Sequence, residues 1–100
     1  MAKIKSVLVD DMNTCYSCGI EGSDYVQIEC HHVLFGSYQK SACTKRKLYL
    51  PLCGQCHRAN NGPHKNRQID LEYRMMAQRY YEENIGSREE FMSEFGRNYL

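Results

Sequence analysis

The chain has no tryptophan, only three phenylalanines and two prolines among its 100 residues. A domain of this length buries only about 60–65% of its unfolded surface, so a core with few large apolar side chains needs another stabilising element. No apolar run approaches the roughly 18 residues that a membrane-spanning helix needs. The N-terminal residues also lack the apolar segment and cleavage site of a secretory signal. We therefore expect one cytoplasmic domain with a stabilising element besides its core.

Acidic residues are absent between Cys30 and Ile69. This window holds seven of the thirteen Lys and Arg residues. The rest of the chain holds the other six together with all twelve acidic residues, so the net charge of +1 hides a strong asymmetry. Such separation predicts a face that attracts anions, most often nucleic acid, although a solvated loop with a chance run of Lys is the alternative. The candidate phosphate contacts are Lys40, Lys45, Arg46, Lys47, Arg58, Lys65 and Arg67.

Four of the six cysteines form two CxxC pairs, Cys15 with Cys18 and Cys53 with Cys56. Disulfides are the alternative, but cytosolic thiols stay reduced, and paired CxxC motifs are typical of a structural zinc ion with four tetrahedral ligands. A redox dithiol usually occurs singly beside a βαβ pattern, which is missing here. We expect the remaining two to be a buried strand residue, Cys30, and an incidental loop thiol, Cys43.

The pattern of the chain predicts an α+β fold. We expect a short strand or an extended entry segment over 4–9, and strands over 25–33 and 47–52. A long loop is expected over 34–46, and a helix from the second CxxC to about Asn60, where Asn61–Pro63 breaks it. A second helix is predicted from Asp70, as N-cap, to about residue 84. Ser87 and Glu90 predict a capping box for a last helix that ends at Gly96. Residues 1–68 would form a zinc-bound core, and 69–100 a helical extension of the same domain.

The histidines stand at informative positions in this pattern. His31 and His32 end the predicted strand, His57 follows the last CxxC directly, and His64 comes seven residues later. Adjacent side chains of a strand point to opposite faces, so one of the pair can bind a metal while the other faces a substrate. Imidazole ligands suit Zn²⁺, Ni²⁺, Mn²⁺ or Co²⁺, and the acid-free window argues against a site of paired carboxylates.

The order CxxC, strand with His-His, strand, CxxCH and helix resembles the zinc-stabilised HNH nucleases, also called ββα-metal or His-Me finger nucleases. It particularly resembles small phage and prophage proteins of this type with a tail like GSREEFMSEFGRNYL, which implies the cytoplasm of a bacterial host. The core of the resemblance covers about residues 15–64, and a weaker part extends to Leu100. It implies a small zinc-stapled ββα-metal core followed by two C-terminal helices.

The resemblance also implies an activity, the hydrolysis of DNA phosphodiester bonds with a catalytic divalent ion (Mg²⁺, Mn²⁺, Ni²⁺ or Zn²⁺). His32 would be the general base that takes a proton from the attacking water. His31 and His57 would hold the catalytic metal together with Asn61 or His64. The ion would neutralise the scissile phosphate and stabilise the leaving oxygen.

One residue of the HNH pattern is missing. The family usually carries an Asn five or six residues before the second CxxC, and here Lys47 and Leu48 stand at those places. Ser37, Gln39 or a backbone carbonyl could replace it. The missing Asn favours a second hypothesis, a zinc-dependent nucleic-acid-binding module without catalysis. A third is a partner-binding zinc protein that docks through its acidic helices.

Overall fold

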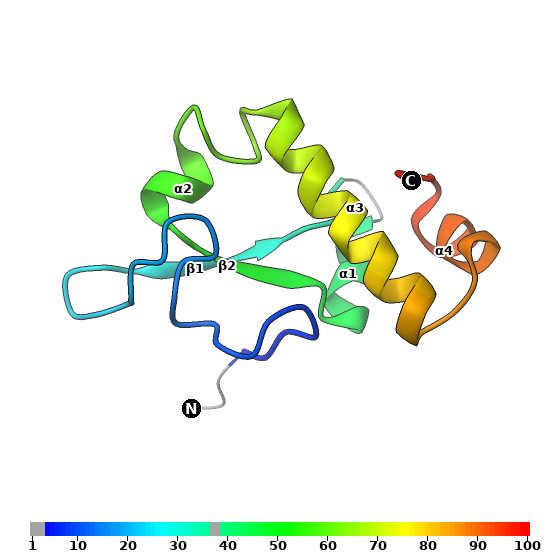
Figure 1. The fold of residues 1–100 in the computed structure, drawn as a ribbon, viewed down its shortest axis with the longest axis horizontal. Coiled ribbons are helices and arrows are strands. Elements are labelled where there is room, and N and C mark those ends of the chain that lie inside the picture. The colour runs from blue at the N-terminus through cyan, green and yellow to red at the C-terminus, as the bar shows by residue number, and fades with distance from the viewer. Residues whose placement is uncertain (1–3, 37–38) are drawn as a thin grey trace.

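The computed structural model describes residues 4–36 and 39–100, which form an α+β fold (Figure 1). A two-stranded antiparallel sheet lies at its centre, with α3 passing diagonally across it in the view and α4 beyond α3. The described residues contain, in chain order, β1 (Ile28–His32), α1 (Gln39–Arg46), β2 (Tyr49–Cys53), α2 (Gly54–Arg58), α3 (Arg67–Asn84) and α4 (Arg88–Phe95).

The two strands pair with Ile28 opposite Cys53 and His32 opposite Tyr49. Every residue of β2 is buried, whereas β1 is mostly half-buried. The other edge of β2 is covered by the N-terminal segment, because the backbone N–H of Tyr16 donates to the Pro51 carbonyl at 2.7 Å and the Ser6 hydroxyl donates to the Tyr49 carbonyl. Residues 4–9 therefore shield a sheet edge without forming a strand, so only the first of the two predicted alternatives is wrong.

The prediction of a loop over 34–46 is also wrong, because its second part forms α1. This helix has few apolar residues, so its sequence lacks the helical period that identifies a half-buried helix. Packing against β1 and α4 stabilises it instead. Cys43 is fully buried, with its thiol donating to the Leu48 carbonyl, and is not the loop thiol expected. Lys47 ends the helix in the left-handed conformation, at φ 59°.

The long helix α3 begins earlier than its sequence pattern indicates. Its N-cap is Asn66, whose side chain accepts from the Ile69 N–H, and not Asp70. Asp70 lies in the first turn and binds Arg74 at i+4. The last helix agrees with its prediction: Ser87 and Glu90 form the capping box, and Gly96 closes α4 in the left-handed conformation at φ 78°.

One hydrophobic cluster joins the sheet, α1 and the C-terminal helices. Leu50 and Leu52 of β2 belong to the same cluster as Phe91 and Phe95 of α4. A boundary at residue 68 would fall inside the first turn of α3, so the helices are packed as part of the core. Within residues 4–36 and 39–100, no helix combines the length and the apolar character needed to cross a membrane.

Glu94 of α4 links three helices through its carboxylate. It accepts from Arg46 Nε of α1 at 2.7 Å and from the Tyr81 hydroxyl of α3 at 2.8 Å. The hydrogen bond from Arg46 is the main reason why the pKa of Glu94 lies below its ordinary value. Burial and the same carboxylate raise the pKa of Tyr81 to about 12.

This contact predicts a pH-dependent stability. A carboxyl with a lowered folded-state pKa stabilises the fold above its unfolded pKa, and this stabilisation is lost as the pH falls through the folded-state value. We expect Glu94→Gln to lower the free energy of unfolding by about 1–2 kcal/mol at pH 7. The difference from the native chain, measured by urea unfolding, should shrink as the pH falls through the lowered folded-state pKa of Glu94. Glu83→Gln, on the exposed side of α3, is the matched control, and an equal loss in both variants would contradict the prediction.

Candidate metal centre

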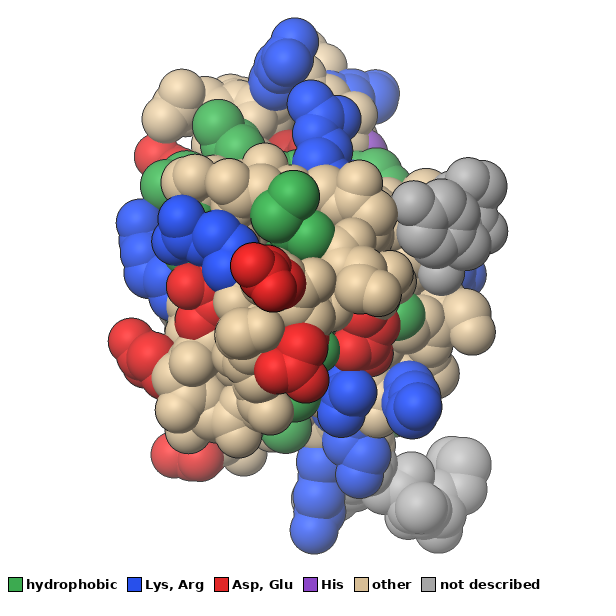
Figure 2. Space-filling view, turned by 90° about the vertical axis from the view of Figure 1, so that its right-hand side faces the viewer, with side chains coloured by type: hydrophobic (Ala, Val, Ile, Leu, Met, Phe, Trp, Pro, Cys, Tyr) green, Lys and Arg blue, Asp and Glu red, His purple; other side chains and the backbone are tan. Residues whose placement is uncertain are grey.

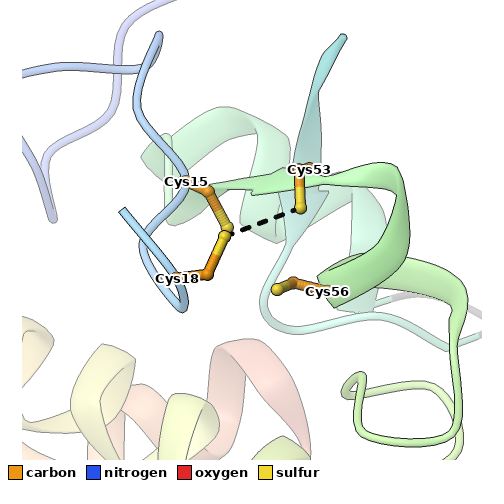
Figure 3. A group of neighbouring side chains, drawn as sticks. All are labelled: Cys15, Cys18, Cys53 and Cys56. Carbon is orange, nitrogen blue, oxygen red and sulfur yellow. Dashed lines mark hydrogen bonds between the residues drawn. The ribbon is translucent and has the colours of Figure 1, made fainter. Parts of the chain in front are cut away.

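The four CxxC cysteines gather in one cluster, as predicted (Figure 3). Cys15 and Cys18 come from the N-terminal segment, Cys53 ends β2 and Cys56 lies in α2. Their sulfurs all lie within 4.8 Å of one another, and those of Cys18 and Cys53 are 3.9 Å apart. In a tetrahedral zinc site with Zn–S bonds of about 2.3 Å, neighbouring sulfurs are about 3.8 Å apart. The cluster therefore has the size needed to hold a metal ion such as zinc.

The surroundings of these thiols also suit a cation. Burial alone would raise the pKa of Cys15, but hydrogen bonds from the backbone of Cys53, Cys18 and Ser17 lower it to about 6. Cys56 behaves in the opposite way, because burial and the neighbouring thiols raise its pKa to about 12. Four thiolates at such short distances repel one another, so the cluster needs a positive ion to become fully ionised.

A second cluster is formed by His31 of β1, His57 of α2 and His64 of the following turn. The turn folds back because the N–H of Gly62 donates to the Ala59 carbonyl at 2.8 Å. A Cβ at Gly62 would lie only 2.6 Å from the His57 carbonyl oxygen, so this approach requires glycine. The turn returns His64 to the helix that carries His57, and the Asn61–Pro63 helix break is where the sequence predicts it.

The rings of His31 and His64 both approach one atom of the third ring, His57 Nε2. His31 Nδ1 lies 3.2 Å from this atom, and His64 Nε2 lies 3.1 Å from it. Two nitrogens that bind one zinc ion at about 2.0–2.1 Å in a tetrahedron are about 3.3–3.4 Å apart, so these separations match a shared ion. Two N–H···N hydrogen bonds to His57 are the alternative interpretation of the same distances.

Glu29 supports the metal interpretation, although the sequence analysis did not identify it. Its Oε1 accepts a hydrogen bond from His57 Nδ1 at 2.7 Å. With the proton on Nδ1, His57 Nε2 has a free lone pair directed at the cluster, as in carboxylate–histidine–metal arrangements. The signal was present in the sequence, because Glu29 and His31 are two residues apart and so share one face of β1. Glu29 lies just outside the acid-free window, which concealed it.

The surroundings of His31 and His64 favour the neutral form of these two side chains. Burial, followed by the neighbouring imidazoles, lowers the pKa of His31 to about 3. Burial and His57 also lower the pKa of His64. Neutral imidazole is the form that binds metal ions. His31 is almost fully buried, and its Nε2 is the one buried side-chain nitrogen or oxygen without a partner among the described residues.

The structure separates His32 from this cluster. Because side chains alternate along a strand, its ring lies on the other face of β1. There it packs against the ring of Tyr49, with the two ring centroids 4.8 Å apart. Burial and then the charge of Lys40 lower its pKa. Asn61 is exposed in the turn after α2. Of the two replacements considered for the missing Asn, Ser37 lies outside the described residues, and Gln39 binds the Phe95 carbonyl and the Tyr99 hydroxyl.

Most of the predicted phosphate contacts are exposed, but two of the arginines are paired. Arg46 is held by Glu94, and Arg58 lies 3.1 Å from the carboxylate of Glu29. Lys65 and Arg67 are exposed on the segment that joins the histidine cluster to α3. Lys40, Lys45 and Lys47 form a second group at α1. The basic window therefore divides into two regions of the surface.

The cysteine cluster predicts a tightly bound ion. We expect the purified chain to contain one zinc per chain at this cluster, and Cys53→Ser to lose both the zinc and the folded core. Structural zinc supplies about 10–16 kcal/mol of folding free energy in small domains, so removal by a chelator should unfold the native chain. Native mass spectrometry and far-UV circular dichroism measure the two effects. Cys30→Ser, outside the cluster, should keep both zinc and fold, and its failure to do so would contradict the assignment.

The histidine cluster predicts a weaker second site. With the cysteine site already filled by zinc, added Co²⁺ should produce visible absorption from the histidine site. Glu29→Gln should lower the affinity for Co²⁺ about 10–100-fold, as loss of a carboxylate partner of a metal-bound histidine typically does. His57→Ala should abolish binding, whereas His32→Ala should leave it unchanged. Equal Co²⁺ affinity in the native chain and the His57 variant would rule out the site.

Comparison of the chain with protein-family models, with curated proteins and with solved structures gave no match. The functional assignment therefore depends on the geometry of the two clusters.

Proposed function

We propose that the chain is a metal-dependent HNH-type endonuclease that hydrolyses DNA phosphodiester bonds. The main support is the convergence of His31, His57 and His64, with the carboxylate of Glu29 behind His57. Three converging imidazoles, one of them oriented by a carboxylate, form a typical open site for a divalent ion. The fold around them is then the small ββα-metal core of that class, with β1 and β2 as the hairpin and α2 as the helix.

In this proposal the cysteine cluster binds a structural zinc ion. The ion joins the N-terminal segment to the end of β2 and the start of α2, so it determines where α2 begins. His57 is the residue after the last zinc ligand, and its position relative to β1 depends on that junction. The structural ion would therefore place a catalytic ligand without taking part in the reaction.

Each histidine has a distinct role in the proposed reaction. His31, His57 and His64 hold the divalent ion (Mg²⁺, Mn²⁺, Ni²⁺ or Zn²⁺), with Asn61 as a candidate additional ligand. When bound, this ion neutralises the scissile phosphate and stabilises the leaving oxygen. Glu29 holds the tautomer and the ring orientation of His57. His32 is the proposed general base and removes a proton from the attacking water.

A second candidate function is a zinc-dependent nucleic-acid-binding module without catalysis. The contact that favours it is the packing of His32 against Tyr49, on the face of β1 opposite His31. A general base must reach the proton that it abstracts, directly or through one water. The missing Asn of the HNH pattern favours this candidate as well. Both candidates use the same basic regions of the surface.

A plasmid assay separates the two candidates. We expect the native chain to nick supercoiled plasmid with at least one of Mg²⁺, Mn²⁺, Ni²⁺ or Zn²⁺. Loss of a general base should lower the rate about 10²–10⁴-fold, so His32→Ala should be nearly inactive while it still binds Co²⁺ at the histidine cluster. His57→Ala should lose both properties.

Two results would count against this assignment. If the native chain binds DNA but cuts it with none of these ions, the binding module replaces the nuclease. If the plasmid is nicked equally well by the native chain and by His32→Ala, another group is the base.

A further inference from the structure

A pocket of about 380 Å³ opens next to the histidine cluster, between α3 and the C-terminal segment. We call it the arginine pocket, and the residues that matter here are Phe35, Gln39, Arg67, Arg74, Arg97 and Tyr99. A larger hollow, of about 810 Å³, lies between the N-terminal segment and β1, and none of the histidines lines it. The arginine pocket is therefore the described hollow that adjoins the candidate metal centre.

Phe35 connects the arginine pocket to the histidine cluster. Its ring centroid lies 4.7 Å from that of His64, and the guanidinium carbon of Arg74 lies 4.4 Å from the same phenylalanine ring. The two distances place the Arg74 guanidinium within about 9 Å of the His64 ring. One nucleic-acid strand can reach both places, because its phosphates follow one another at about 3.4 Å along the helix axis.

Arg74 builds the wall of the pocket and is not itself free to bind a ligand. Its Nε donates to Asp70 at 2.9 Å, and its Nη1 donates to Gln39 Oε1 and to the Tyr99 hydroxyl. Its Nη2 donates to the Phe35 carbonyl at 3.3 Å. These bonds occupy the guanidinium group of Arg74, and the ion pair neutralises Asp70, the acid in the pocket wall. They also attach the C-terminal segment to α3.

The Tyr99 hydroxyl is left with a donor directed at no acceptor among the described residues. A hydroxyl has one donor and two acceptor positions. Both acceptor positions of Tyr99 are used, one by Arg74 Nη1 at 2.9 Å and one by Gln39 Nε2 at 3.1 Å. Its O–H can therefore only donate, and residues 4–36 and 39–100 offer no acceptor for it. The pocket thus has an unused donor at its wall.

Two further cations line the arginine pocket and remain available. Arg67 is the first residue of α3, and Arg97 follows the end of α4. Neither forms an ion pair with an acid in the described part of the chain. In the space-filling view, Lys and Arg side chains lie at the end of this face where α3 begins and also at its left and lower parts, and acidic side chains lie between them (Figures 1 and 2). Two free guanidinium groups and one hydroxyl donor suit an oxyanion.

We propose that the arginine pocket binds a phosphodiester group of the nucleic-acid strand next to the one at the histidine cluster. This assignment rests on the proposed function, and it adds Arg97 and Tyr99 to the substrate contacts. Arg67 and Arg97 neutralise the phosphate, Tyr99 donates to one of its oxygens, and Phe35 separates the pocket from the metal ligands. The C-terminal segment thereby becomes part of the substrate site.

The test measures DNA binding without cleavage. A short labelled DNA duplex is titrated with zinc-loaded protein, with no second divalent ion, at several KCl concentrations, and anisotropy gives the dissociation constant. We expect the double variant Arg67→Gln, Arg97→Gln to bind about tenfold more weakly. The slope of log affinity against log salt should fall by about one for each arginine removed. Both side chains are exposed and unpaired with acids, so the variant keeps the fold. Arg79→Gln, exposed on α3 and outside the pocket, should bind like the native chain.

The possible outcomes separate this inference from the nuclease assignment. Equal affinity and equal salt slope in the double variant and the Arg79 variant would overturn the inference, whether or not the native chain cuts DNA. Inorganic phosphate that shifts the amide signals of Arg67 and Arg97, without any loss of DNA affinity in the double variant, would assign the pocket to free phosphate and also overturn it. Weaker DNA binding by the double variant, in a native chain that cuts no plasmid, would support the pocket and reject the nuclease.

Discussion

The gathering of four thiol groups is the contact on which the rest of the structure depends. The core is small, and the segment before β1 contains no helix or strand among its described residues. Cys15 and Cys18 meet Cys53 and Cys56 at the point where β2 becomes α2. A cation at this point would compensate for the shortage of large apolar side chains. It would also fix the direction in which α2 leaves the sheet, because two of the four sulfurs belong to that junction.

The histidine cluster follows from the same junction. His57 is the residue after Cys56, so it can move little relative to the cysteine cluster. β1 is bonded to β2 and therefore brings Glu29 and His31 to α2, and the close turn at Gly62 returns His64 to the same place. Three separate chain segments thus meet at one point through local constraints. Such an arrangement needs little reorganisation when a ligand binds, which is what metal sites in proteins require.

The C-terminal helices are more than a cover for the core. Phe91 and Phe95 complete the hydrophobic cluster, and Glu94 ties α4 to α1 and α3. Beyond α4, the chain returns to α3 through the bonds that Tyr99 makes with Arg74 and Gln78. The polar contacts of this segment therefore lie on the side of α3 that continues toward the histidine cluster. The C-terminal segment can therefore stabilise the fold and, in the proposed function, also contact the substrate.

The sequence by itself determined the elements whose signals are local. The CxxC spacing identified the cysteine cluster, the capping box and Gly96 defined α4, and the strand pattern placed β1 and β2 within a few residues. Each of these depends on residues close together in the chain, where spacing and backbone preference decide the outcome. The pattern left residues 4–9 open between a strand and an extended segment, and it predicted a loop where α1 forms. The first segment is held by a sheet edge and α1 by packing against β1 and α4, and neither contact has a local pattern.

Only the tertiary structure decided how the candidate site is assembled. The family resemblance grouped His31 and His57 with Asn61 or His64, but the distances of 3.1–3.2 Å from His57 Nε2 to the nitrogens of His31 and His64 depend on how three segments pack. Glu29 was missed because its role comes from a contact with a residue 28 positions away. Arg97 and Tyr99 belong to the predicted helical extension, and only the fold places them in the pocket that Phe35 also lines. Charge and spacing along a chain describe neighbours in sequence, whereas a binding site is made of neighbours in space.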